Sequence, residues 1–141
     1  MIWFLRHGDA ADGADDFARP LTEKGERQSL AAGRALAELG VTIDACLTSP
    51  RVRALGTARL ACEPLGVEPE VADELGGGDF DPEALAAGRG DVLLVGHEPD
   101  FSRAVGDLTG ARIGMKKGGL AAVDGHVLTR LLRPSELKRI G

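Results

Sequence analysis

Apolar residues in this chain form short continuous runs that alternate with longer segments of helical spacing. The runs at 1–5 and 91–95 have the length of buried strands, and residues 41–47 carry apolar side chains at every second position. Segments 22–39 and 51–65 repeat small and apolar residues every three or four positions, which is typical of amphipathic helices. Strands that alternate with helices indicate a parallel sheet covered by helices. We therefore expect a three-layer α/β/α sandwich with a mostly parallel central sheet.

The rest of the chain predicts shorter elements. Residues 66–71 favour an edge strand, because Pro69 has no amide hydrogen to give to a neighbouring strand. The dipeptide Asp124-Gly125 is a strong signal for a type I′ turn between two hairpin strands. Short helices are expected at 82–87, 100–108 and 135–140. Since the sequence has no internal repeat and no linker, we expect a single domain over residues 1–141.

Basic residues and histidines follow three of the predicted strands. The first strand ends at Arg6 and His7, Arg53 lies shortly after the second, and His97 follows the strand at 91–95. Because parallel strands deliver their carboxyl ends to one edge of a sheet, residues that are far apart in the sequence can converge there. Two arginines and two histidines in one pocket predict an anion-binding site.

The side chains favour a phosphoryl group as this anion. Guanidinium groups bind phosphate oxygens with paired hydrogen bonds and stay cationic at physiological pH. Arg6 and Arg53 would surround the group, and Arg19, in the loop after the first strand, would join them. One histidine, kept neutral, could attack phosphorus, while the other, protonated, would balance charge on the phosphoryl oxygens. This arrangement predicts phosphoryl transfer.

Composition narrows the possible functions. The formal net charge of -5 argues against nucleic acid as the main partner. No apolar run approaches the roughly 18 residues of a membrane span, and we expect a cytoplasmic protein without a membrane partner. Cys46 and Cys62 lack the spacing of a redox or zinc motif, so we expect both thiols to be reduced.

Other chemistries lack support in the sequence. His7, His97 and His126 show no metal-ligand spacing, so we expect neither a metal ion nor another cofactor. No serine lies in the Gly-x-Ser-x-Gly turn of serine hydrolases. Lys116 and Lys117 are interpreted as a solvated pair, with attraction of an anionic partner as the alternative.

Four short motifs add a family resemblance to this reasoning. They are Arg6-His7-Gly8, Leu21-Thr22-x-x-Gly25, Ser49-Pro50-x-x-Arg53-Ala54-x-x-Thr57-Ala58 and Val95-Gly96-His97. In type and order they resemble the histidine phosphatase superfamily, in the branch that contains phosphoglycerate mutases. The start of the chain and the Arg19-Pro20 pair look most like the SixA group of protein phosphohistidine phosphatases. The resemblance implies a phosphoglycerate mutase-like fold.

The resemblance also implies a role for each matching residue. His7 would be the nucleophile that becomes phosphohistidine, and Arg6, Arg53 and His97 would form the phosphate pocket. Arg19 matches an arginine that lies near the phosphate in the SixA group. We expect a phosphatase that needs no metal ion.

Two further charged residues, Glu74 and Arg51, lie in or near the segments that carry these motifs. Glu74 is the nearest positional match to the acidic proton donor of larger family members, although its flanking residues depart from their pattern; the alternative is a solvated loop acid. Arg51 lies two residues before Arg53, about 200° around a helix. We therefore assign Arg51 to the surface.

The departure from the family pattern around Glu74 bears on the substrate. A phosphohistidine needs a positioned acid less than an alkyl phosphate does, since its imidazole can take up a proton before or during cleavage of the P–N bond. The short segment 75–91 leaves little chain for a lid, which suits a bulky substrate. We expect hydrolysis of phosphohistidine on a histidine phosphotransfer domain. The alternatives are a phosphatase of small phosphorylated metabolites and a phosphate-binding module without activity.

Overall fold

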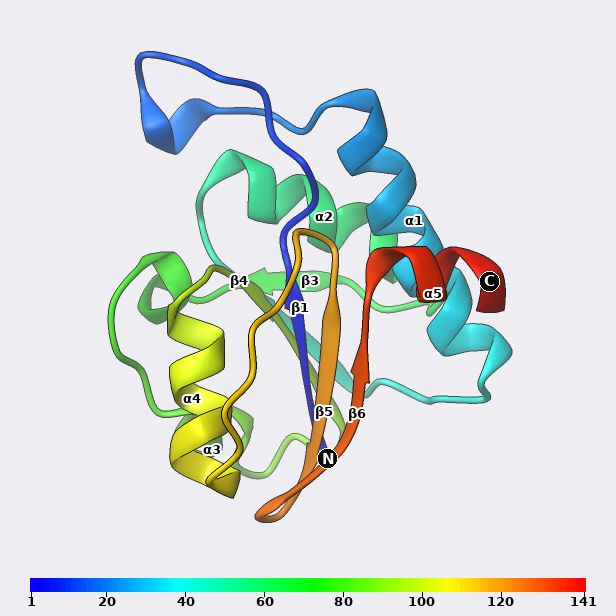
Figure 1. Cartoon of the computed structure of the whole chain (residues 1–141), viewed down its shortest axis with the longest axis vertical. Helices are drawn as coiled ribbons and strands as arrows, with labels where there is room; N and C mark the ends of the chain where they lie inside the picture. Colours follow the sequence, from blue (N-terminus) through cyan, green and yellow to red (C-terminus); the bar gives the residue numbers. More distant parts are fainter.

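A six-stranded mixed sheet forms the centre of the computed structural model, which describes residues 1–141 (Figure 1). The strands are β1 (Ile2–Arg6), β2 (Ala45–Thr48), β3 (Pro69–Val71), β4 (Val92–Gly96), β5 (Leu120–Asp124) and β6 (Val127–Leu132). They lie in the order β3-β2-β4-β1-β5-β6. The four strands from β3 to β1 are parallel, whereas β5 and β6 each run antiparallel to the strand before them in the sheet. The sheet is therefore mostly parallel, as predicted.

Helices cover both faces of this sheet. They are α1 (Glu23–Glu38), α2 (Val52–Cys62), α3 (Pro82–Ala86), α4 (Asp100–Thr109) and α5 (Pro134–Ile140), with 3-10 turns η1 (Asp16–Ala18) and η2 (Asp73–Gly76). α1, α2 and α5 pack on one face, and α3 and α4 lie on the other (Figure 1). This confirms the predicted three-layer sandwich. None of the helices combines the length and the hydrophobicity needed to cross a lipid bilayer.

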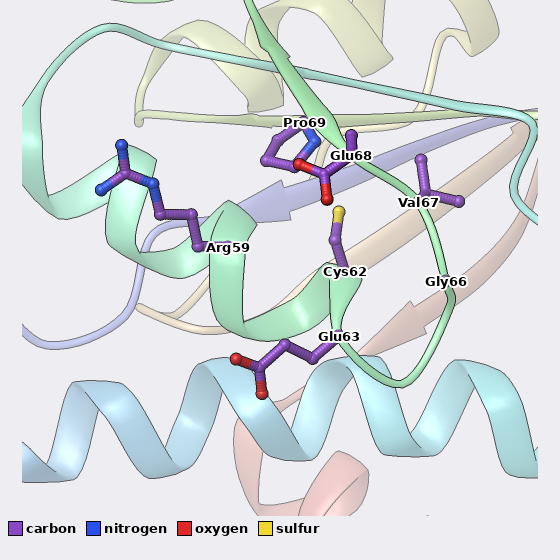
Figure 2. A pocket seen from close by; sticks show the side chains of 7 residues that line it. All are labelled: Arg59, Cys62, Glu63, Gly66, Val67, Glu68 and Pro69. Carbon is purple, nitrogen blue, oxygen red and sulfur yellow. The ribbon is translucent and has the colours of Figure 1, made fainter.

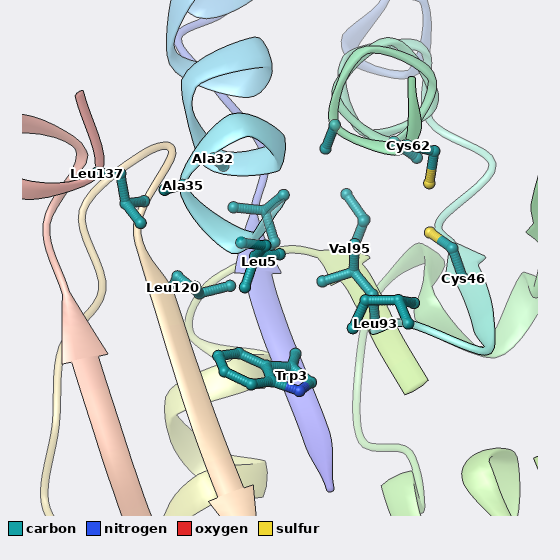
Figure 3. Packing of buried hydrophobic residues seen from close by; sticks show 14 of the residues in the cluster. Trp3, Leu5, Ala32, Ala35, Cys46, Cys62, Leu93, Val95, Leu120 and Leu137 are labelled. Atoms are coloured by element: carbon teal, nitrogen blue, oxygen red, sulfur yellow. The ribbon is translucent and has the colours of Figure 1, made fainter. Parts of the chain in front are cut away.

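Successive residues of β1 face opposite cores. Trp3 and Leu5 pack in the core formed with α1, α2 and α5, which also contains Leu137 (Figure 3). Phe4 points to the other face and meets Phe101 of α4 edge to face, with ring centroids 5.3 Å apart. Full burial of each such side chain contributes about 1.5–3 kcal/mol to folding. The carboxyl end of β1 is therefore a rigid support for the residues that follow it.

Three predicted boundaries differ from the structure. The edge strand expected at 66–71 begins only at Pro69. β2 begins at Ala45 rather than at 41, because the chain leaves α1 through Gly40 with a φ of 74° and the Val41 amide donates back to the Leu36 carbonyl oxygen. α2 ends at Cys62 instead of continuing to 65. The predicted edge strand and hairpin are both present, as β3 and as the β5–β6 pair.

The amino-terminal end of α1 contacts the backbone that follows β1. A Cβ atom on Gly8 would lie 2.6 Å from the Gly25 carbonyl oxygen, and one on Gly25 would lie 2.0 Å from the Asp9 carbonyl oxygen. The Thr22 hydroxyl accepts from the Gly25 amide, as expected of a helix cap, and donates to the Asp9 carboxylate. Because these contacts involve backbone on both sides, α1 determines where the chain runs just after His7.

Candidate active site

The carboxyl ends of β1, β2 and β4 bring the predicted anion-binding residues together. Arg6 is paired with Gly96 in the parallel β1–β4 ladder, so His7 and His97 occupy equivalent positions just beyond the two strands. Their ring centroids are 5.2 Å apart. Arg53, in the first turn of α2, lies close enough for its charge to act on both imidazoles. His7, His97 and Arg53 are only 6%, 7% and 8% exposed.

A hydrogen bond at one nitrogen of the His7 ring leaves the other ring nitrogen with its lone pair. Its Nδ1 lies 2.7 Å from the Gly8 carbonyl oxygen. Because a carbonyl oxygen can only accept, Nδ1 carries the proton and Nε2 keeps its lone pair. The Gly8 amide in turn donates to the Thr57 hydroxyl, which donates to the Arg53 carbonyl oxygen. This chain of hydrogen bonds ties the His7 ring to α2 and leaves Nε2 as a nucleophile.

Both imidazoles are neutral near pH 7. The pKa of His7 is lowered to about 4, mainly by burial and in part by the charges of Arg53 and Arg6, against the hydrogen bond to Gly8, which raises it. Burial also lowers the pKa of His97 to about 3, with contributions from His7 and Arg53. The neutral state of His7 agrees with a nucleophilic role. His97 differs from the expected protonated partner, because its burial beside two cationic groups disfavours a further positive charge.

Three buried nitrogens at this site have no hydrogen-bond partner within the protein. They are Nε of Arg6, Nε of Arg53 and Nδ1 of His97. A buried N–H without a partner costs about 1–3 kcal/mol, so such groups are rare in folded proteins. These three come from β1, from α2 and from the turn after β4, and they belong to the residues whose charges act on His7 or whose ring lies beside it. The arrangement can bind an oxyanion next to the free nitrogen of His7.

Asp16, which the sequence did not single out, lies among the arginines at the rim of this site. Its carboxylate accepts from Arg19 at 3.0 Å, from Arg51 at 2.8 Å and from Arg53 at 3.3 Å. Its carbonyl oxygen accepts a second bond from Arg53 at 2.8 Å. The side chain of Asp16 is 58% exposed, and the neighbouring arginines lower its pKa, most of all Arg19. Arg19 therefore reaches Arg53 through Asp16.

Arg51 also belongs to this rim, contrary to the expectation that it points away. It is the N-cap of α2 and has an extended backbone with φ -64° and ψ 139°, so the angle between helical positions does not apply to it. Its Nε donates to the Gly76 carbonyl oxygen, and its guanidinium group lies 5.9 Å from the ring centroid of Phe17. Arg51 thus connects η1, η2 and α2 above the site.

Comparison with known proteins identifies the family. Residues 2–82, more than half of the chain, match the sequence profile of the "Histidine phosphatase superfamily (branch 1)". The chain belongs to this superfamily. The matched region contains Arg6, His7, Arg19, Arg53 and the rim residue Asp16, and it ends before the strand that leads to the second histidine.

Individual proteins are also similar to this chain. An uncharacterized protein of Picosynechococcus sp. is 38% identical over 135 residues, which cover 84% of this chain and 81% of the relative. A structure described as the protein histidine phosphatase SixA complexed with tungstate aligns with a TM-score of 0.84 and 28% identity, covering 97% of this chain and 99% of that one. Phosphoserine phosphatase of Entamoeba histolytica has the same fold, with a TM-score of 0.68, 16% identity and coverages of 96% and 98%. The family match and the similarity to SixA support phosphatase activity, whereas the likeness to the phosphoserine phosphatase shows a shared fold.

Glu74 differs from the other predicted residues in its surroundings. It lies in η2, is exposed, and its carboxylate forms neither a hydrogen bond nor an ion pair. The neighbouring Gly76 carbonyl oxygen contacts Arg51, so η2 is adjacent to the rim. The role of Glu74 as a proton donor in this histidine phosphatase stays a prediction.

A pocket also exists at the opposite end of α2 from Arg53. It is lined by Arg59, Cys62, Glu63, Gly66, Val67, Glu68 and Pro69 (Figure 2). None of the predicted site residues lines this pocket. Across the chain, no group of three His, Cys, Asp or Glu side chains is placed to hold a metal ion. The edge of the sheet at His7 therefore remains the candidate site of this histidine phosphatase.

Proposed function

We propose that this protein is a phosphohistidine phosphatase that acts on a phosphotransfer protein and forms a covalent phosphohistidine on His7. One observation carries the proposal. The free Nε2 of His7 lies in a buried site with three unpartnered nitrogens, a combination that serves both nucleophilic attack and charge stabilisation. The similarity to a protein histidine phosphatase that binds tungstate, itself an oxyanion, supports the same conclusion.

In the first step the lone pair of His7 Nε2 attacks phosphorus. The P–N bond of the substrate breaks, and its electron pair returns to the substrate imidazole, which takes up a proton from solvent. Arg6, Arg53 and His97 donate hydrogen bonds from their unpartnered nitrogens to the three nonbridging oxygens. These oxygens carry the negative charge that must be stabilised during phosphoryl transfer. Arg19 acts at the rim through Asp16.

In the second step water attacks the phosphohistidine. The P–Nε2 bond breaks, its electron pair restores the lone pair of His7, and inorganic phosphate leaves after the water has lost a proton to solvent. No metal ion takes part in this scheme, because the arginines supply the positive charge. A phosphohistidine substrate fits a site where the nearest candidate acid, Glu74, is exposed, since an imidazole leaving group can be protonated by solvent.

Two alternatives use the same residues differently. A phosphatase of small phosphorylated metabolites would need an acid to protonate an alkoxide leaving group, and Glu74 would be that acid. A phosphate-binding module would use the unpartnered nitrogens without transfer to His7. A mutase is less favoured, because it must retain the intermediate in a closed pocket.

The substrate is tested by comparing kcat/KM on a phosphorylated histidine phosphotransfer domain with kcat/KM on a panel of sugar phosphates. We expect the phosphorylated domain to be preferred, and a clear preference for a sugar phosphate would overturn the proposed substrate. Turnover of an aryl phosphate should persist in excess EDTA and be abolished by His7→Ala. Matched replacement of the exposed His126 by Ala should leave turnover unchanged. Full activity of His7→Ala, or phosphate binding without any turnover, would refute the enzyme mechanism.

A further inference from the structure

Ser49 occupies a buried position behind the second histidine of the site. It follows β2, is fully buried, and places its Oγ 2.8 Å from Nε2 of His97. The Ser49 amide donates to the Val95 carbonyl oxygen, and its Oγ accepts from the Arg51 amide at 3.2 Å. These two bonds hold the hydroxyl between β2, β4 and the start of α2.

Counting hydrogens determines the direction of the Ser49–His97 bond. A hydroxyl has one hydrogen to donate and can accept two. The Arg51 amide already occupies one acceptor position of Oγ, and His97 Nε2 is the only acceptor that the Ser49 hydroxyl reaches. If Nε2 were the donor, the Ser49 hydrogen would be buried without a partner, which carries a desolvation cost. The hydroxyl therefore donates, and Nε2 accepts.

The direction of this hydrogen bond determines whether Nδ1, the other ring nitrogen of His97, carries a hydrogen. A neutral imidazole has a single N–H, and the hydrogen bond at one nitrogen decides which tautomer is present. Because burial keeps the pKa of His97 near 3, the ring is neutral at pH 7. Nδ1 then carries the hydrogen, and this is the nitrogen that has no partner within the protein. In the opposite tautomer Nδ1 would present a lone pair, which repels a phosphoryl oxygen.

We propose that Ser49 is a positioning residue that holds His97 in the Nδ1–H tautomer, so that this N–H donates to the phosphoryl group on its way to His7. The inference rests on the proposed function for the identity of the anion, but not for the tautomer. Ser49 does not touch the phosphoryl group; it acts through His97. The serine of the Ser49-Pro50 motif therefore orients a histidine that lies 48 residues further along the chain.

The tautomer is measured directly by NMR of protein labelled with 15N histidine. We expect Nδ1–H for His97 in the wild-type protein, and Nε2–H or a mixture in Ser49→Ala. Observation of the Nε2–H tautomer in the wild-type protein would overturn the inference. Because this readout needs no substrate, it stands apart from the proposed function, which fails instead if His7→Ala keeps full turnover.

Kinetics test whether Ser49 acts through His97. Ser49→Ala should lower kcat/KM for an aryl phosphate on the order of 10- to 100-fold, the usual effect of losing a partner that orients a functional histidine. In a His97→Ala background the same replacement should cost little more, because the ring that it orients is gone. An equal loss in both backgrounds would mean that Ser49 supports the fold only.

Two further variants complete this test. Ser29→Ala is the matched control, since Ser29 is also fully buried but its hydroxyl donates to the Gly25 carbonyl oxygen within α1. Its turnover should stay close to that of the wild-type protein. Ser49→Cys retains the size of the side chain with a weaker donor, and it replaces Ser49→Ala if that variant does not fold. We expect an intermediate loss of turnover in Ser49→Cys. Wild-type turnover together with an unchanged His97 tautomer, in whichever of the two variants folds, would refute the role of the hydroxyl.

Discussion

Replacement of Gly25 by alanine tests how α1 determines the position of His7. Gly25 is the third residue of α1 and is buried against the segment that follows His7. In most helices this change stabilises the protein by about 1 kcal/mol, because alanine has the higher helix propensity. Here the added Cβ would lie 2.0 Å from the Asp9 carbonyl oxygen. The two backbone segments must therefore separate.

The size of the effect follows from this distance. An ordinary carbon–oxygen contact is about 3.3 Å, so α1 and Asp9 must move apart by about 1.3 Å. Overpacking of this kind costs about 1–3 kcal/mol, which offsets or exceeds the gain in helix propensity. Asp9 is two residues from His7, and a displacement of about 1 Å at a reacting group can lower turnover by about 10²-fold. We therefore expect kcat/KM of Gly25→Ala to fall strongly while the free energy of unfolding decreases only slightly.

The assay combines urea unfolding with hydrolysis of an aryl phosphate. Gly106→Ala is the matched control, since it is also a helical glycine and its Cβ would make an ordinary contact of 3.4 Å with the Ala111 carbonyl oxygen. That control should be as stable as the wild-type protein or slightly more stable, with unchanged kcat/KM. A Gly25→Ala protein that is more stable than wild type and fully active would refute the reasoning.

Three other predictions concern charge. The pKa of His7 near 4 and that of His97 near 3 lie below the ordinary value of 6.5, so the unfolded chain binds protons first and the free energy of unfolding should fall as pH drops from 6.5 toward 4. Urea midpoints of wild type and His97→Gln measure this; an equal fall in both would contradict the assignment. Asp16→Asn removes the carboxylate shared by three arginines, so inorganic phosphate should inhibit more strongly, whereas Asp12→Asn in the same loop should change nothing. Weaker inhibition would show that Asp16 holds the arginines in place. If Glu74 is the acid, Glu74→Gln should slow alkyl phosphates much more than aryl phosphates, and equal slowing would exclude it.

Most of the site could be inferred from the sequence because its residues directly follow strands. Side chains at the carboxyl ends of parallel strands must meet at one edge, whatever the details of packing. Arg6, His7 and His97 were placed in this way, and the predicted sandwich follows from the same alternation of strands and helices. Family membership, which the motifs indicated, is confirmed by the match over residues 2–82.

The rim of the site could not be inferred in this way. Asp16 lies in a loop without periodicity, and its position depends on η1 and on the isolated bridge between Ala10 and Leu21, which folds the loop back. Arg51 lies at the rim, contrary to the helical angle that the sequence predicts for it, because α2 begins one residue after it. Neither feature leaves a pattern in the sequence, since both result from where a loop or a helix end meets the rest of the molecule.

The sequence by itself determined the fold class, the edge of the sheet at which the site lies, and the residue types that make it an anion site, because these depend on periodicity and on strand order alone. Only the tertiary structure decided the protonation and orientation of the two histidines. Burial beside Arg53 keeps both rings neutral, the Gly8 carbonyl oxygen leaves Nε2 of His7 free, and the Ser49 hydroxyl orients His97. These properties arise from contacts between segments that are distant in the chain, and such contacts exist only once the chain has folded.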